Sequence, residues 1–173
     1  MISPDSKQLA SVISACIDVD DKIDLFEWLL GRIVVRRLRA RIEMRVHREG
    51  SLRLDAVAES AARAVYAVAR RGARSEEAAA EAFKIGAKRL GRDFSVPQKR
   101  SMTLEQLGEA FDQLEQADMD VRVRLLEACI AAASHDGVIR TGEYEMIRAV
   151  ADAMGLPMPP IFPGAVEEPV ESS

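Results

Sequence analysis

Apolar positions recur every three or four residues along most of the chain, which is the period of amphipathic helices. No alternation of apolar and polar residues is long enough to indicate a convincing strand. The pattern therefore predicts an all-α fold of about seven helices around one core. The expected helices begin near Lys7, Leu25, Leu52, Ser75, Thr103, Asp118 and Thr141.

Several helix ends carry local sequence signals. Ser75 is a good N-cap, and Thr103 and Gln106 have the spacing of a capping box. Thr141 is expected to cap the last helix and Gly155 to end it. Pro97 falls in a break between two helices, because few apolar positions there repeat at helical spacing.

The length of 173 residues fits about one domain. We expect a single helical domain over residues 1–160. Residues 161–173 are acidic and contain proline, so we expect a disordered tail there.

Two acidic stretches match at one offset. Val19–Trp28 and His135–Tyr144 share Asp, Ile, Glu and an aromatic residue at positions 116 residues apart, since 136 − 20 and 143 − 27 are equal. The chain therefore looks like two copies of a helix–acidic turn–helix unit with further helices between them.

Composition narrows the class of protein. Apolar residues make up 48% and charged residues 30% of the chain, as in folded proteins that dissolve in water. The net charge of −4 argues against general nucleic-acid binding. The N-terminus lacks the apolar core of a signal peptide, and no apolar run approaches the roughly 20 residues of a membrane span. Cys16 and Cys129 form no metal-binding pair, so we expect a reducing, cytoplasmic setting and two buried thiols.

The second acidic turn resembles the later half of an EF-hand calcium loop. The first ligand position of such a loop would fall on Ala132 in this copy and on Cys16 in the other, so neither is a complete EF-hand. Two interpretations remain: the acidic side chains and Gly137 shape the turn and the helix start, or the carboxylates bind a divalent cation or a basic partner. The candidate metal ligands are Asp20, Asp21, Glu27, Asp136 and Glu143.

The second expected helix has a polar side that is almost entirely arginine. Such a run is either a solvated face paired with carboxylates or a surface for an acidic partner or an anionic membrane. The candidate residues for this surface are Arg32, Arg36, Arg37, Arg39, Arg41 and Arg45.

No catalytic motif is recognisable. The His-Glu-x-x-His zinc signature, Gly-x-Ser-x-Gly, the Walker A loop and the dinucleotide fingerprint are all absent. We therefore expect a chain that is not an enzyme and has no cofactor, apart from the divalent cation already considered.

Five segments together resemble one family. They are Cys129–Ile139, Glu143–Asp152, Pro157–Pro160, Asp21–Glu27 and Ala82–Gly91. They resemble the TerB-like helical region at the C-terminal, cytosolic end of bacterial membrane-bound zinc metallopeptidase-like proteins of the HtpX type. Leu156 stands where the family often has cysteine, and Asp21 where it has glycine.

The resemblance implies a TerB-like helical bundle and a non-catalytic regulatory or interaction domain. The partner would be another protein or the membrane part of the parent protein, and the location would be cytoplasmic, at the inner face of the cell membrane. None of the peptidase's zinc ligands matches a residue of this chain. The alternative is a stand-alone TerB-like stress-response domain that binds a divalent cation through its acidic turns.

Overall fold

The computed structural model describes residues 29–31, 33–34, 50–91, 93–98, 102–158 and 166–167. Contacts divide the chain into two compact units, Met1–Glu49 and Gly50–Ser173. The single domain expected over residues 1–160 spans both units and stays a prediction. In the first unit the described residues are helical, with Leu29 and Ile33 buried and Leu30 and Val34 exposed.

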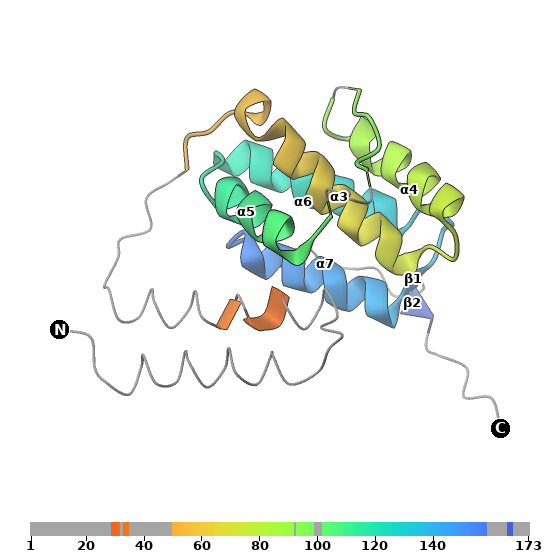
Figure 1. Cartoon of the computed structure of the whole chain (residues 1–173). Helices are drawn as coiled ribbons and strands as arrows, with labels where there is room; N and C mark the ends of the chain where they lie inside the picture. The colour runs from red at the N-terminus through yellow and green to blue at the C-terminus, as the bar shows by residue number, and fades with distance from the viewer. Residues whose placement is uncertain are drawn as a thin grey trace. The chain divides into compact units, whose positions relative to one another are not determined.

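The second unit is a bundle of α-helices, which confirms the all-α prediction (Figure 1). One 3₁₀ turn and two very short strands accompany them. In chain order the elements are η1 (Leu54–Val57), α3 (Ala58–Gly72), α4 (Glu76–Lys88), α5 (Leu104–Glu115), α6 (Met119–Ala133), β1 (Ile139–Arg140), α7 (Thr141–Ala153) and β2 (Val166–Glu167).

Helix α3 is the centre of this bundle, because it contacts α4, α5, α6 and α7. The inward face expected for this helix is buried at Ala61, Val65 and Val68 of α3 and at Val57 of η1, whereas Leu54 of η1 is only half-buried. Large side chains from the surrounding helices, and from the turns that end α4 and α7, fill the core around it. They are Phe83, Leu90, Leu114, Leu125, Met146, Ile147, Val150 and Met154.

Aromatic packing joins α3 to α4. The rings of Tyr66 and Phe83 meet edge to face, with centroids 5.7 Å apart and planes at 85°. Such a pair contributes about 0.5–1.5 kcal/mol beyond its buried area. The Tyr66 hydroxyl also donates a hydrogen bond of 2.9 Å to Glu76 Oε2, so this tyrosine ties α3 to the first turn of α4.

The predicted helix starts are confirmed for α4 and α5. Ser75 Oγ accepts a 3.2 Å hydrogen bond from the Ala78 amide. Thr103 and Gln106 form the expected capping box, with hydrogen bonds of 3.2 and 3.3 Å between the side chain of each and the backbone amide of the other. These bonds satisfy amides that have no partner inside the helix.

The end of α7 is also as predicted. Gly155 has φ +68°, and its amide donates to Asp152 O, while the Leu156 amide reaches back to Ala151 O. This is a Schellman motif, which satisfies carbonyls at the end of a helix. Leu156 is buried at the same time.

The prediction that a helix begins at Leu52 was wrong. Leu52 instead forms a parallel bridge to Ala117, with its amide donating to Gln116 O and its carbonyl accepting from the Asp118 amide, both at 3.0 Å. The chain then passes through η1, and α3 starts only at Ala58. Pairing with a distant segment has overridden the local helical pattern.

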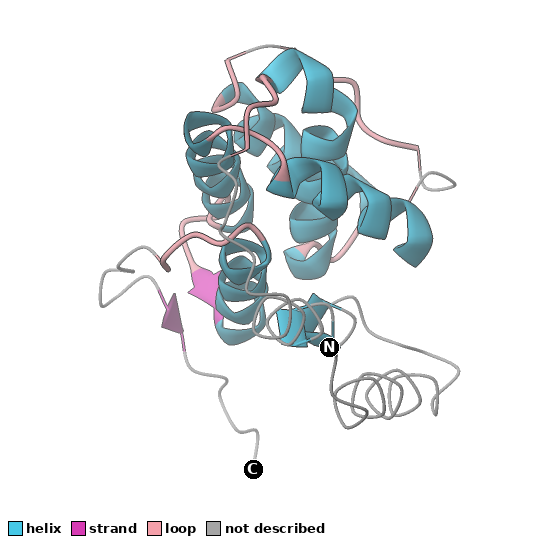
Figure 2. Ribbon diagram, turned by 90° about the vertical axis from the view of Figure 1, so that its left-hand side faces the viewer, coloured by secondary structure: helices cyan, strands magenta, loops and turns pink. Residues whose placement is uncertain are grey.

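Two residues of the C-terminal stretch form β2 and pair in parallel with β1. Ile139 lies opposite Val166, and Arg140 lies opposite Glu167. Figure 2 shows the two strands at one end of the bundle. Strands of two residues have no periodicity, so the sequence pattern did not indicate them. The rest of the predicted disordered tail lies outside the described residues.

Candidate functional site

The acidic turn between α6 and α7 is shaped by its own side chains. Asp136 Oδ1 accepts a 3.2 Å hydrogen bond from the Val138 amide, and the Gly137 amide donates to Ser134 O at 3.0 Å. Gly137 has φ +87°, a conformation that favours glycine, as expected from the sequence. The turn therefore uses aspartate and glycine in the roles that tight turns require.

Arg140 joins the two candidate carboxylates of this turn. Its Nη1 lies 2.8 Å from Asp136 Oδ2 and 3.7 Å from Glu143 Oε2. The Arg140 amide also donates a 2.8 Å hydrogen bond to Glu143 Oε2. Asp136 and Glu143 are thus brought together around one arginine.

The start of α7 differs from the prediction by one residue. Arg140 is the N-cap and Thr141 is the first helical residue, so the expected capping role of Thr141 was wrong. Glu143 takes over part of that role, since its carboxylate accepts the N-cap amide. A negative charge in the first turn also suits the positive end of the helix dipole.

Glu143 is a buried carboxylate, only 3% exposed. Its Oε2 has the Arg140 amide as a partner, whereas its buried Oε1 has no hydrogen-bond partner among the described residues. Oε1 lies against Gly72 at the end of α3, where an added Cβ would be 1.7 Å away. The side chain therefore points into the contact between α3 and α7.

Interactions in the turn also set the ionisation of Asp136. Partial burial would raise the pKa of this carboxyl, but the Arg140 hydrogen bond and the Val138 amide outweigh burial and hold the pKa below its usual range. The charges of Arg140 and His135 act in the same direction. Asp136 is thus a stable partner of Arg140.

The metal prediction rests on five carboxylates, of which the structure describes Asp136 and Glu143. Within the described ranges, no group of three or more His, Cys, Asp or Glu side chains is placed to hold a metal ion. Asp20, Asp21 and Glu27 lie outside these ranges. So do Arg32, Arg36, Arg37, Arg39, Arg41 and Arg45, the predicted partner or membrane surface.

Cys129 is fully buried in α6, as expected. Burial raises the pKa of its thiol to about 12. Because the thiolate is the reactive form of cysteine, this side chain is a packing group rather than a nucleophile.

A buried arginine was not anticipated from the sequence. Arg122 is 2% exposed, and its Nη1 donates a 2.9 Å hydrogen bond to Met154 O at the end of α7. The position suits a cation, because the C-terminal end of a helix carries partial negative charge. Its spacing from Leu125, Leu126 and Cys129 places Arg122 on the inward side of α6, and this signal could have identified it.

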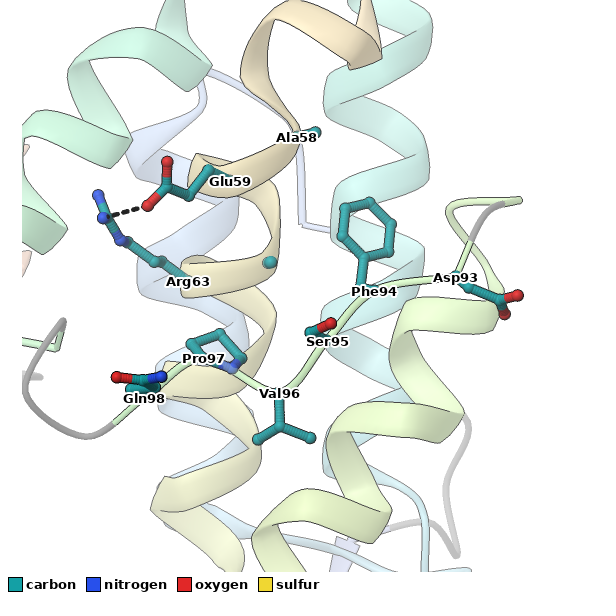
Figure 3. A pocket seen from close by; sticks show the side chains of 10 residues that line it. Ala58, Glu59, Arg63, Asp93, Phe94, Ser95, Val96, Pro97 and Gln98 are labelled. Carbon is teal, nitrogen blue, oxygen red and sulfur yellow. Dashed lines mark hydrogen bonds and ion pairs between the residues drawn. The ribbon is translucent and has the colours of Figure 1, made fainter.

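A groove runs between α3 and the extended segment Asp93–Gln98 (Figure 3). Its volume is about 520 Å³. Apolar lining comes from Ala58 and Ala62 on α3 and from Phe94, Val96 and Pro97 on the segment. The sequence indicated only a break here, because the groove depends on how the segment lies against α3.

Glu59 and Arg63 supply charge on the α3 side of the groove, and Figure 3 shows their ion pair. The Arg63 side chain is 16% exposed and the Glu59 side chain 80%. Most of the Arg63 side chain is thus shielded from water, whereas its carboxylate partner is mostly exposed.

The extended segment has backbone N–H and C=O groups that are not paired with backbone groups of other described residues, and we call these groups its unused edge. In the part of the chain that the structure describes, Ser95 and Val96 make no backbone hydrogen bond. Polar backbone groups at such an edge can pair with another extended chain.

No protein-family model, curated protein or solved structure matches this chain. Among the described helices, none has both the length and the apolar character needed to cross a membrane.

Proposed function

We propose that this chain is a non-catalytic interaction domain that binds an extended segment of a partner protein in the groove beside α3. The observation that carries the proposal is the unused backbone edge at Ser95 and Val96, which borders an apolar groove of about 520 Å³.

The backbone edge and the apolar lining serve different parts of such a ligand. An extended peptide can pair its backbone with Ser95 and Val96, as in strand addition. One of its apolar side chains then enters the space between Ala58, Ala62 and Phe94. Backbone pairing supplies affinity in this mode, and the side-chain pocket supplies specificity.

Arg63 favours a carboxylate on the peptide. Its present partner, Glu59, lies four residues earlier on the same helix and is mostly exposed, and such a pair contributes only about 0.3–0.5 kcal/mol. A peptide carboxylate that excludes water from Arg63 can therefore replace Glu59 at little cost. The ligand class is an extended peptide with an apolar residue next to an acidic one.

The wider setting follows from the resemblance to TerB-like regions of HtpX-type metallopeptidase-like proteins. In that setting the domain lies in the cytoplasm at the inner face of the membrane. The bound segment belongs to the membrane part of the parent protein or to a substrate. The residues that support this setting are those that match the family, above all Asp136, Gly137, Ile139 and Glu143.

Selection from a phage-displayed library of random linear peptides tests the proposal with the full chain as bait. We expect enriched peptides that combine an apolar and an acidic residue, and fluorescence anisotropy measures their affinity. Ala58→Trp fills the groove and Arg63→Gln removes the cation, so each should weaken binding at least about tenfold, or 1.4 kcal/mol. Ala58 is half-buried at the first position of α3, and circular dichroism checks that both variants fold.

Glu59→Gln is the matched control, because it removes the competing carboxylate and leaves the groove open. It should bind the selected peptides as well as the wild type or better. The proposal fails if no peptide is enriched, or if Ala58→Trp and Arg63→Gln bind the enriched peptides as the wild type does.

The alternative function is a stress-response domain that binds a divalent cation through its acidic turns. One observation favours it, namely the buried Glu143 Oε1 without a hydrogen-bond partner. Against it, Arg140 already interacts with both Asp136 and Glu143. We therefore expect isothermal titration with millimolar calcium to give no binding heat, and a saturable signal lost in Asp136→Ala would favour the alternative.

A further inference from the structure

The solvent side of α6 carries two large apolar residues next to a charged stripe of Asp120, Arg124 and Glu127. The buried side of this helix faces α3, α4 and α7, yet Met119 and Val123 are 52% and 41% exposed. Met119 and Val123 are four residues apart, so they lie on one side of the helix. Two large apolar side chains exposed side by side begin an apolar patch that a partner can cover.

The solvent side of α6 continues onto α4. A hollow there is lined by Ile85 and Arg89 of α4 and by Glu127 and Ile130 of α6. Ile85 is 37% exposed, and Glu127 follows Val123 by one helical turn. We call Ile85, Arg89, Met119, Val123, Glu127 and Ile130 the α4–α6 face.

Close packing between α4 and α6 makes this face rigid. An added Cβ at Gly86 would lie 2.5 Å from Ala128 O and 2.9 Å from Ala132 Cβ, so α4 and α6 are in very close contact. The two helices therefore present their outward side chains on a fixed surface, and a partner would bind without first ordering it.

The face carries one exposed cation and one exposed anion beside the apolar hollow. Arg89 and Glu127 are both exposed, and neither forms an ion pair with another described residue. The charges of these two residues are opposite, so the pair itself favours neither an acidic nor a basic partner. Opposite charges on either side of an apolar centre instead complement the same surface turned by a two-fold rotation.

We propose that the α4–α6 face binds a second copy of this chain across a two-fold axis. Ile85, Val123 and Ile130 of each copy pack at the centre. Arg89 of each copy lies opposite Glu127 of the other, which fixes the register of the two surfaces. This inference does not depend on the proposed peptide groove, which is lined by different residues.

Sedimentation equilibrium of the full chain tests the proposal. We expect the wild type to populate dimers at micromolar to millimolar concentration. Arg89→Glu and Glu127→Arg should each weaken the dimer about tenfold or more, because like charges then face each other twice. Ile85→Glu should have the same effect by placing charge in the apolar centre, and thermal melts check that all variants fold.

Mixing the two charge variants gives the decisive measurement. In a two-fold dimer, a copy with Arg89→Glu faces a copy with Glu127→Arg through two restored pairs of opposite charge. The mixture should therefore form heterodimers while each variant alone stays monomeric. Because each variant carries only one of the two charge reversals, the restored association requires contact between two different copies.

Glu109→Arg on the exposed surface of α5 is the matched charge-reversal control and should leave association unchanged. A wild type that stays monomeric at all concentrations would overturn the proposal. Dimers that persist in all three variants would overturn it as well. Monomeric variants should still bind peptides at the α3 groove, so the two proposals can fail separately.

Discussion

Gly72 and Glu143 fit together at the point where α3 meets α7. The space that a side chain at Gly72 would need is occupied by the Glu143 carboxylate, with Oε1 1.7 Å from the position of an added Cβ. Glu143 is held there from its other side by the Arg140 amide. Gly72, the last residue of α3, thus leaves space for the carboxylate of Glu143 in the first turn of α7.

Gly72→Ala should destabilise the protein. Alanine is normally the better helix residue by about 1 kcal/mol, but here its methyl group would displace a buried carboxylate from its hydrogen bond. We expect a net loss of about 1–3 kcal/mol in the free energy of unfolding, measured by urea denaturation. A stabilised Gly72→Ala protein would show that Glu143 does not occupy this space.

A double-mutant cycle isolates the contact. Glu143→Ala alone should destabilise the protein because it removes the acceptor for the Arg140 amide. Once Glu143 is shortened, Gly72→Ala has room, so the double variant should lose less stability than the two single losses added together. Strict additivity would contradict the contact.

Gly86→Ala should destabilise the protein strongly. Its Cβ would lie 2.5 Å from the backbone oxygen of Ala128, which cannot move unless α4 and α6 separate. We expect a loss of about 2 kcal/mol or more, visible in a thermal melt. Gly142→Ala is the matched control because a Cβ there meets nothing within 4 Å, and it should be neutral or stabilising.

The Asp136 carboxyl should titrate at lower pH than an aspartate in an unfolded chain. Since its pKa is lowered in the folded state, the stabilisation is present above the unfolded pKa and is lost as pH falls through the folded value. NMR titration of the side-chain carboxyl carbon measures this pKa directly. Arg140→Gln should raise it, and an unchanged titration would mean that the Arg140 contact is not formed in solution.

Cys129 should resist thiol reagents in the native state. Its pKa of about 12 leaves almost no thiolate at pH 8, and burial also excludes the reagent. In a Cys16→Ser background, we expect no reaction with Ellman's reagent until guanidinium unfolds the protein. Rapid modification of the native chain would indicate that α6 opens easily.

The helices were predictable where their signals are local. Ser75, Thr103 and Gln106 form hydrogen bonds within three residues, so their identities and spacing are enough to locate the starts of α4 and α5. Gly155 ends α7 for the same reason. The beginning of α3 was not predictable, since Leu52 pairs with the connection around Ala117, which is far away in sequence.

The candidate site residues were likewise predictable only where their interactions are local in sequence. Asp136 and Gly137 were identified as turn residues from sequence, because their roles are satisfied by adjacent backbone groups. The burial of Glu143 against Gly72 could not be read from the pattern, since it depends on the approach of α3 to α7. The α3 groove also depends on tertiary structure, because Phe94 and Val96 form a groove only when their segment lies against Ala58 and Ala62 of α3.

The bridge at Leu52 has a mechanical consequence. Both of its backbone hydrogen bonds go to the connection between α5 and α6, and Gly50 lies so close that a Cβ there would be 2.2 Å from Ala117 O. A pulling force transmitted along the chain from residues 1–49 would reach this clamp before it reached α3. The two hydrogen bonds would take this load first and pass it to the connection between α5 and α6, so they would have to break before the chain could be pulled away as far as α3.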